Sequence, residues 1–477
     1  MERIGRAGLA LVALAATLAP AGPAAAAGKR WTRITAANFS PLEQVGLART
    51  DDRVLKVAWV HQEPGGTYDL VVTPVRRDGR AGAPTVVARG WTTLASPALV
   101  RTGPRSLALL WAGIRSTNTG EPLTGLNAAA SGDGATWSLV AQSLSLGGAG
   151  PVSAVLGPPP ARTIYSAWST RGENSVFSGL VPSAALPPQF TAPQCCYTNV
   201  GLAVDGRSGE LVAATDSIAA TQPGRSLVRL TAAGAAAGPA VHPPGAFVRT
   251  GPGAYGAITG GGRPAIIGRP QRPGIFTAYI SGKSGRTRVL VWRLGAPRAA
   301  VLGTTALGYV PDSLGLAAAP SGRIWAFWAE KAATPSGYAV VARRSNRAAT
   351  RFGPRLAVVP PPGTVNLTEA AGNAQTGPLD LLLSSQHSNV DSAAWHRQFI
   401  TGVSLFPTPR RARPGQKVTF LVTDAGDPVR RARVRFGARS ARTNAKGKVT
   451  LPAPAATTVA TVTASGYGAA RAKVTVG

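Results

Sequence analysis

The sequence predicts an all-β protein with two folded domains, and three observations lead to this prediction. One pattern recurs seven times at intervals of about fifty residues: a small apolar segment, a turn, and an apolar strand that usually ends in an aromatic residue. Each copy has the composition of β-strands, and no convincing amphipathic helix interrupts the series. From about residue 402 the pattern changes to short alternating strands. Strand repeats of this length are typical of β-propeller blades, so we expect a seven-bladed propeller, or alternatively six blades, over 31–401.

The opening of each repeat predicts a hairpin. In the first copy 46–48 leads to 54–59, and in the second 98–100 leads to 107–111. Turn residues separate the two segments, which makes the first an inner strand and the second its antiparallel partner. The second segments of the seven copies end at Trp59, Trp111, Trp168, Thr215, Tyr279, Trp328 and Leu383. We predict that the four tryptophans fill equivalent buried positions near the blade centres.

Third and fourth strands complete the predicted blades. A third strand is clear at 288–294 and at 338–343, and a weaker fourth strand fits 137–140 and 356–359. Antiparallel strands in this order build one blade, and a ring of blades protects the strand edges.

A short turn motif stands between the third and fourth strands of the second repeat. It is Ser131-Gly-Asp-Gly-Ala-Thr-Trp137, in which the Asp133 carboxylate can accept hydrogen bonds from nearby backbone N–H groups. The motif resembles the Asp-box of sialidase-like propellers, although it is one residue shorter, and 345–352 resembles a degenerate copy. The resemblance implies a propeller fold and structural roles for Asp133 and Trp137, with Trp137 packed between neighbouring sheets.

Residues 402–477 predict a small β-sandwich. Five strands fit at 418–423, 432–436, 448–451, 457–464 and 472–476. The stretches 424–429 and 443–450 resemble bacterial Ig-like and carboxypeptidase-regulatory-like modules, which implies a domain that spaces or attaches. Fourteen Lys and Arg residues against Asp424 and Asp427 give this part a net charge of +12. This charge favours adhesion to an anionic surface.

The first 27 residues have the pattern of a secretory signal peptide. Arg3 and Arg6 precede an apolar run at 7–19, and small residues with A-x-A sites follow at 20–27. The apolar run is short for a bilayer core of about 30 Å. We therefore expect a secreted or extracellular protein, with association with the cell surface as the alternative to a soluble form.

The composition is strongly basic. Lys and Arg number 51 against 20 Asp and Glu, a formal net charge of +31, although only 15% of the residues are charged. Such a charge attracts polyanions over a long range. We expect an anionic glycan or a cell-envelope polymer as the partner, with peripheral association with the envelope. We expect no specific nucleic acid, because no recognition motif accompanies the charge.

The two cysteines of the chain are adjacent, at Cys195 and Cys196. Export favours oxidation, but neighbouring Cα atoms lie about 3.8 Å apart, so a vicinal bridge would be strained. The alternatives are two buried thiols or a bridge to another chain. The pair precedes the fourth repeat, which places it on the same face as the polar residues described next. We expect no metal and no cofactor, because His is scarce and zinc, phosphate-loop and nucleophile-elbow motifs are missing from the sequence.

Polar residues follow the second strand of each repeat. The series is His61, Arg115, Arg171, Asp216, Lys283, Glu330 and His387. Repeat symmetry places these side chains on one face, where the segments before the first strands add Gln44, Asn199, Asp312 and Asn366. A convergent polar set over a concave centre is a ligand-site hypothesis. The simpler alternative is that strands emerging into solvent end in polar residues in any case.

These observations favour a non-catalytic protein that binds a glycan, an envelope polymer or a peptide. The alternative is a sialidase-like glycoside hydrolase with a degenerate site, and a third hypothesis is a scaffold for protein partners. The sialidase resemblance implies arginines that bind a substrate carboxylate, for which Arg115 and Arg171 are candidates. The Phe/Tyr-Arg-Ile-Pro signature of that family is missing. Asp216 and Glu330 are the available pair for the two-carboxylate mechanism of other glycosidases.

Overall fold

The computed structural model describes residues 30–38, 44–76, 78–115, 123–141, 150–169, 174–178, 189–190, 197–217, 224–245, 263–283, 286–306, 313–331, 337–388 and 391–477. These residues form strands and turns without a helix, which confirms the all-β prediction for them. Over the same ranges, therefore, no helix is long and apolar enough to cross a membrane. The predicted signal peptide lies outside the described residues.

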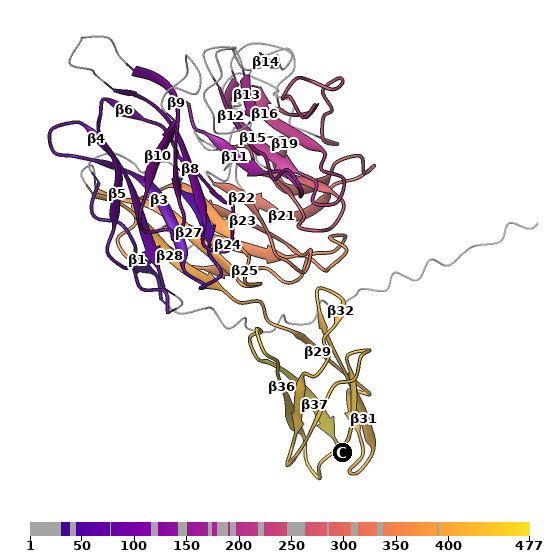
Figure 1. The fold of residues 1–477 in the computed structure, drawn as a ribbon. Helices are drawn as coiled ribbons and strands as arrows, with labels where there is room; N and C mark the ends of the chain where they lie inside the picture. The colour runs from indigo at the N-terminus through magenta and orange to yellow at the C-terminus, as the bar shows by residue number, and fades with distance from the viewer. Residues whose placement is uncertain are drawn as a thin grey trace, which may run out of the picture.

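The described part of 30–399 forms seven antiparallel sheets (Figure 1). The first sheet holds β2 (Gly46–Arg49), β3 (Leu55–Gln62), β4 (Tyr68–Val75) and β5 (Thr85–Trp91). The second holds β6 (Thr93–Leu94), β7 (Ala98–Arg101), β8 (Leu107–Arg115), β9 (Leu123–Ser131) and β10 (Ser138–Ala141). The third holds β11 (Ser153–Leu156), β12 (Ile164–Ser169), β13 (Asn174–Ser178) and β14 (Gln189–Phe190).

The remaining four sheets repeat this order. The fourth holds β15 (Tyr197–Val204), β16 (Leu211–Ser217) and β17 (Gly224–Leu230). The fifth holds β18 (Ile266–Gly268), β19 (Ile275–Lys283), β20 (Arg286–Arg293) and β21 (Ala300–Ala306). The sixth holds β22 (Leu314–Ala318), β23 (Ile324–Lys331), β24 (Tyr338–Arg344) and β25 (Leu356–Val358). The seventh holds β26 (Asn366–Asn373), β27 (Leu379–Ser388), β28 (Asp391–Phe399) and, from the other end of the chain, β1 (Thr32–Arg33).

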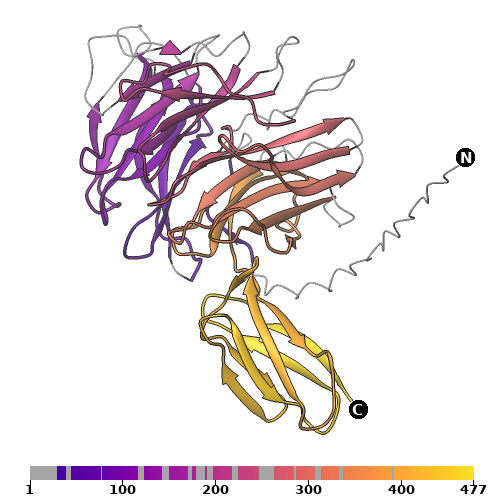
Figure 2. The same ribbon diagram turned by 90° about the vertical axis from the view of Figure 1, so that its right-hand side faces the viewer.

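The seven sheets close into a ring. β1 pairs antiparallel with β28, with Thr32 opposite His396, so the beginning of the described chain completes the last sheet. The first strands of neighbouring sheets contact one another in a closed cycle that runs through β2, β7, β11, β15, β18, β22 and β26. The sheets therefore surround a common centre, which is the arrangement of a β-propeller (Figure 2).

Apolar clusters fill the spaces between neighbouring sheets. In every space except the one before the fourth sheet, where the residue is Thr215, the aromatic or apolar residue near the end of the second strand packs in the cluster shared with the preceding sheet. Trp111 packs against Trp91 of the first sheet, with ring centroids 6.2 Å apart, and Trp328 packs among apolar residues of the fifth sheet. Trp59, Trp111, Trp168 and Trp328 are 3% exposed or less, which confirms their predicted burial. The pattern recurs in the sequence because each copy supplies apolar side chains to an equivalent space between two neighbouring sheets.

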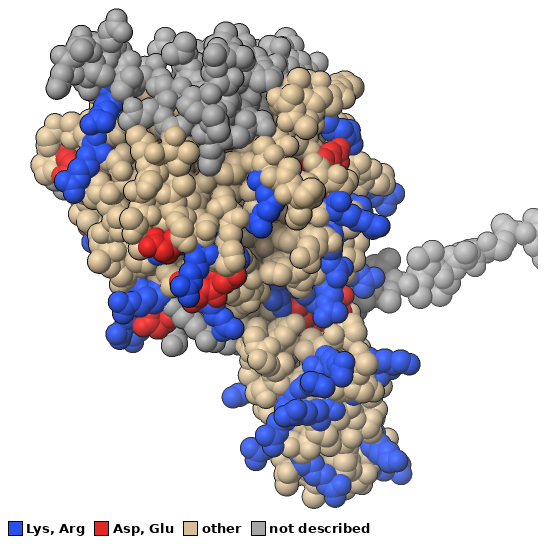
Figure 3. Space-filling model, viewed as in Figure 1, with Lys and Arg blue, Asp and Glu red and all other residues tan. Residues whose placement is uncertain are grey.

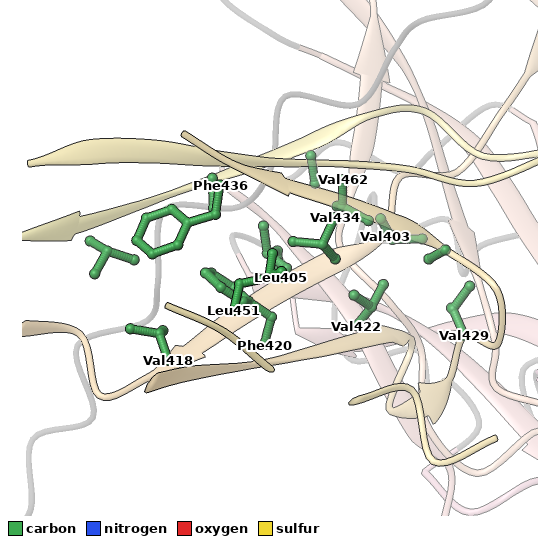
Figure 4. Packing of buried hydrophobic residues seen from close by; sticks show 14 of the residues in the cluster. Val403, Leu405, Val418, Phe420, Val422, Val429, Val434, Phe436, Leu451 and Val462 are labelled. Atoms are coloured by element: carbon green, nitrogen blue, oxygen red, sulfur yellow. The ribbon is translucent and has the colours of Figure 1, made fainter. Parts of the chain in front are cut away.

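Residues 402–477, called the C-terminal domain below, form two further sheets. One contains β29 (Ser404–Thr408), β31 (Lys417–Asp424), β32 (Asp427–Pro428) and β35 (Lys448–Pro452). The other contains β30 (Arg411–Ala412), β33 (Arg433–Phe436), β34 (Arg439–Arg442), β36 (Thr458–Thr463) and β37 (Ala470–Val476). The two sheets share one apolar core (Figure 4), in which the rings of Phe420 and Phe436 lie 5.1 Å apart.

Buried ion pairs hold the C-terminal domain to the propeller. Asp424, the last residue of β31, lies 3.0 Å from Arg323, which directly precedes β23, and 2.5 Å from Arg344 at the end of β24. Asp427 lies 2.6 Å from Arg323 and accepts a hydrogen bond from the backbone N–H of Arg347 at 2.8 Å. Both acidic side chains of this domain are therefore directed at the propeller.

The structure differs from the sequence prediction at the weaker strands. β1 was not predicted, because two polar residues carry no strand pattern and their partner lies far along the chain. The fourth sheet has three named strands, and single bridges from Leu227 to Val241 and from Leu230 to Ala236 stand in for a fourth. The C-terminal domain has short edge strands besides the five predicted ones, such as β29, whose Pro407 weakens the strand pattern.

Candidate functional site

The first strands of the seven sheets enclose a central cavity of about 910 Å³. Its wall consists mainly of small and aliphatic residues of β2, β7, β11, β15, β18, β22 and β26. Close packing demands these small residues: a Cβ atom at Gly46 would lie 3.0 Å from the Pro97 carbonyl oxygen, and one at Gly201 would lie 2.4 Å from that of Pro264. The small apolar segments that open the repeats therefore form the cavity wall.

Gln44 and Arg263 cross the mouth at which the first strands begin. The Arg263 guanidinium donates to the Pro97 carbonyl oxygen at 2.8 Å, and the backbone N–H of Arg263 donates to the Gln44 side-chain oxygen at 3.0 Å. The Gln44 amide donates in turn to the Ala370 carbonyl oxygen at 3.4 Å. These bonds connect the first, second, fifth and seventh sheets and fix the rim of this mouth.

Three arginines line the opposite mouth, where the first strands end. They are Arg101, Arg162 and Arg269, accompanied by the amide side chains of Gln271 and Asn373. The Arg101 guanidinium lies 2.5 Å from the Asp51 carboxylate. The Arg162 side chain is exposed and makes no hydrogen bond or ion pair with the described residues. It is therefore free to bind an anion.

Arg269 is held more tightly than its neighbours at this mouth. Its guanidinium donates to the Arg347 carbonyl oxygen at 3.1 Å and lies 5.4 Å from the ring centroid of Phe276. Burial lowers the pKa of Arg269, and the positive charges of Arg293 and Arg272 lower it further. An arginine in this position still carries its charge at neutral pH.

The described residues that line the cavity include four arginines and no Asp or Glu. Arginine forks bind carboxylate, sulfate and phosphate groups, so this lining suits an anionic ligand. Two-carboxylate glycoside hydrolysis would require acids that the described lining does not supply. Within the described residues, no three His, Cys, Asp or Glu side chains gather as metal ligands.

The polar series predicted from the sequence lies one strand outside the cavity. The strand register puts the start of each first strand opposite the end of the second, as in Gly46 opposite Ala58 and Ala98 opposite Leu110. His61, Arg115, Asp216, Glu330 and His387 therefore share one edge of the propeller, near the Arg263 mouth. None of them lines the cavity.

Asp216 and Glu330 make contacts within the fold. Asp216 forms a buried bidentate pair with Arg225, at 2.5 and 2.6 Å, and Arg225 also donates to Thr277 of the next sheet at 2.8 Å. Glu330 accepts a hydrogen bond from the Trp328 indole at 2.7 Å and pairs with Arg355. These contacts connect strands and sheets, and a ligand-binding role for either residue stays a prediction.

The other predicted residues divide into described and undescribed ones. His61 stacks edge-on against Trp59, Arg115 is exposed, and Asn199 is buried at the start of β15. His387 lies 3.0 Å from the Ser385 hydroxyl. Arg171, Asp312, Cys195 and Cys196 lie outside the described residues, as does the side chain of Lys283. The predictions made for these positions stay open.

The predicted turn around Asp133 has the expected contacts. Asp133 Oδ1 accepts hydrogen bonds from the backbone N–H groups of Ala135 and Thr136 at 2.7 and 2.8 Å. These bonds lower the pKa of Asp133 far below its usual range. Trp137 packs against the cluster between the first and second sheets. The turn lies on the same edge of the propeller as the ends of the first strands but outside the cavity lining, and its structural role stays a prediction.

Sequence reasoning missed the cavity arginines Arg101, Arg162, Arg263 and Arg269. The available signal was positional, because Arg101 ends the first strand β7 and Arg269 directly follows the first strand β18. The prediction followed the second strands instead, whose ends lie farther from the centre.

No family model matches the sequence, and no curated protein matches it. Solved structures match at low identity. The polysaccharide lyase Uly1 is 8% identical, with 78% of this chain and 99% of that chain covered and a TM-score of 0.46. The BP39L lectin from Burkholderia pseudomallei is 14% identical, with 75% and 96% covered and a TM-score of 0.45. An alpha-L-arabinanase from Penicillium chrysogenum is 13% identical, with 78% and 98% covered and a TM-score of 0.40. At these scores the similarity carries no conclusion about ligand or activity.

Proposed function

We propose that this chain is a secreted, non-catalytic β-propeller that binds an acidic glycan in its central cavity. The observation that carries the proposal is the cavity lining, in which four arginines and several amides stand on an apolar wall without a described carboxylate. Arginine and amide donors match the carboxylates and hydroxyls of an acidic sugar. The signal-peptide pattern of 1–27 supports secretion.

The proposed architecture is a seven-bladed, sialidase-like propeller followed by an Ig-like domain. The closed cycle of seven first strands supports seven blades, since each described sheet contributes one. The Asp133 turn supports the sialidase-like assignment. Two sheets packed on one core support the Ig-like assignment of the C-terminal domain.

A sialidase-like hydrolase is the weaker alternative. Asp216 is neutralised by the buried Arg225, and Glu330 is paired with Arg355. Neither carboxylate lines the cavity, and they stand on two different sheets, in β16 and in β23.

Calorimetric titration of the full chain with short neutral and acidic oligosaccharides tests the proposal. We expect acidic ones to bind and to be recovered intact. Arg162→Gln should weaken binding about tenfold, because a charged hydrogen bond is lost. Arg105→Gln, an exposed arginine outside the lining, is the matched control and should bind as the wild type does. Release of shorter sugars, or equal binding by both variants, would contradict the proposal.

A further inference from the structure

The C-terminal domain has a basic surface without exposed acidic side chains. All fourteen of its Lys and Arg residues are exposed. Figure 3 shows the Lys and Arg side chains that cover one face of this domain. Asp424 is 2% exposed and the Asp427 side chain 22%, and both are paired with propeller arginines. Within the described residues none of the fourteen cations forms an ion pair. The domain therefore directs its negative charge inward and leaves its positive charge uncompensated.

Five of these cations lie on the outer face of the five-stranded sheet. Burial alternates along β33, where Val434 and Phe436 enter the core while Arg433 and Arg435 face outward. The same alternation holds in β37, and Arg442 of β34 lies opposite Arg433 on the same face. We call the set the basic face: Arg433, Arg435, Arg442, Arg471 and Lys473.

The register of the strands aligns arginines with hydroxyl groups. One row across the sheet is Ser440, Arg435, Thr461 and Arg471. The next row is Arg442, Arg433 and Thr463. Neighbouring strands lie about 4.8 Å apart and successive outward residues about 7 Å apart. Cations and hydroxyls therefore alternate along the first row, whereas two arginines are neighbours in the second.

Arg433 and Arg442 stand directly opposite each other on adjacent strands. Like charges in this position destabilise a sheet. No described acid offsets the repulsion, because Arg433 contacts only the Ser440 hydroxyl, at 3.2 and 3.3 Å. A bound polyanion would turn this repulsive pair into a favourable one.

We propose that the basic face binds a linear acidic polysaccharide. Guanidinium forks bind carboxylates with two parallel hydrogen bonds, and the intervening Ser and Thr hydroxyls can bond to sugar hydroxyls. Each row of outward side chains crosses neighbouring strands of the sheet, so a polymer that follows a row can contact several strands. This surface goes beyond the proposed function, since it lies on a different domain from the cavity and binds the length of a chain rather than a short oligosaccharide.

The chemistry of the basic face favours a polysaccharide over two other polyanions. Single-stranded nucleic acid is bound by aromatic side chains that stack on bases, and the outward residues of this face include no aromatic. A membrane surface would need apolar side chains to insert, and Val459, 50% exposed, stands alone on this face.

Retention of the full chain on immobilised polygalacturonate, measured against salt, tests the proposal. The test variant is Arg433→Gln/Arg435→Gln/Arg471→Gln. The matched control is Lys417→Gln/Lys446→Gln/Lys448→Gln, which removes the same charge from the other sheet and its turn. We expect the test variant to lose at least about tenfold in affinity and the control less than about threefold. The Arg105→Gln propeller variant, whose side chain lies outside the cavity lining, should be retained like the wild type.

Equal losses of affinity in the test and control variants would overturn the proposal, because they would mean that the polysaccharide responds only to the net charge of the domain. Tighter binding to duplex DNA or to phosphatidylglycerol vesicles than to polygalacturonate, at equal salt, would overturn it as well. The melting temperature of the test variant should equal or exceed that of the wild type, because the Arg433–Arg442 repulsion is relieved. If that variant fails to fold, Arg433→Lys/Arg435→Lys/Arg471→Lys keeps the charge and removes the forks, and wild-type retention by it would refute the proposal.

Discussion

At the scale of single residues, the buried tryptophans are the side chains that most directly join sequence to fold. Trp168 is 1% exposed in the cluster between the second and third sheets. Replacing a buried Trp by Ala should lower the free energy of unfolding by about 3–5 kcal/mol, because contacts are lost and a cavity remains. Val365→Ala, at a side chain 60% exposed, should change it by less than about 0.5 kcal/mol. Chemical denaturation compares the two, and similar midpoints would mean that Trp168 is not a core residue.

Asp380 predicts an acid-dependent contribution to stability. It is 1% exposed, 2.5 Å from Arg49 and 3.0 Å from His396. Burial alone raises the pKa of Asp380, but the hydrogen bond from His396 and the charge of Arg49 outweigh it, so the pKa is lowered on folding. The unfolded chain then binds more protons, and the contribution is present above the unfolded pKa of about 3.9 and lost as pH falls through the folded pKa.

Thermal unfolding of Asp380→Asn between pH 7 and pH 2 tests this contribution. The variant should melt well below the wild type at pH 7, since it leaves Arg49 buried without its carboxylate, and the difference should narrow as the pH falls below about 4. Asp78→Asn, at a surface pair 3.8 Å from Arg80, is the control and should change little. A melting difference that is constant with pH would contradict the lowered pKa.

At the scale of residues, the sequence predicted which side chains are buried but not which charged side chains pair with one another. The tryptophans were predictable because burial repeats with the chain. The partners of Asp216 and Glu330 were not, because a polar residue after an apolar strand has the same pattern whether it meets solvent or a guanidinium from another strand. Arg225 and Arg355 became visible as partners only once the strands were paired.

At the scale of elements, β1 closes the ring although it is only two residues long. Arg33 pairs with Asp391 at 2.6 Å, and the backbone N–H of Ile34 donates to the Ala394 carbonyl oxygen at 2.9 Å. The Trp31 indole donates to the carbonyl oxygen of Val359, the residue after β25, at 2.8 Å. Removing residues 30–38 would expose the edge of β28, so we expect a lower melting temperature and a tendency to associate.

If β1 stabilises the ring by pairing with β28, a separate peptide with the sequence of β1 should restore the stability that the deletion removes. A synthetic peptide of residues 30–38, added to the deletion variant, should raise the melting temperature, because a ligand that binds only the folded state stabilises it. A peptide with Trp31, Arg33 and Ile34 replaced by Ala is the control. Restoration by the control peptide, or no effect of either, would contradict closure by β1.

Elements with their own pattern were predictable, and elements defined by distant partners were not. β3 and β8 were located from apolar runs bounded by turns. β1 depends on a pairing with His396 across almost the whole chain, which no local pattern encodes. The cavity could be predicted only in part for the same reason. Its small wall residues recur in the sequence, but the arginines at its mouths lie at positions that differ from sheet to sheet.

At the scale of the whole molecule, the turn between β31 and β32 decides how the two domains are joined. Its sequence, Asp-Ala-Gly-Asp, looks like an ordinary hairpin turn, and Ala425 and Gly426 have the positive φ values of 50° and 93° that such turns require. The sequence therefore located the domain change near 402 but not the interface. Only the structure shows that Asp424 accepts a hydrogen bond from Tyr467 at 3.3 Å and faces two propeller arginines.

This interface predicts that the domains are coupled. Asp424→Asn leaves Arg323 and Arg344 buried with less compensation, which should cost about 3–5 kcal/mol of interface stability. Because Asp427 would then be the remaining described carboxylate of this domain that pairs with Arg323, we expect the C-terminal domain to move relative to the propeller. Small-angle scattering should show a larger radius of gyration, and calorimetry should show two separated unfolding transitions. Lys417→Gln, exposed on the same domain, is the control and should leave both measurements unchanged. If Asp424→Asn leaves them unchanged as well, apolar contacts rather than the ion pairs orient the domain, and the charge of the C-terminal domain has no bearing on how it is attached.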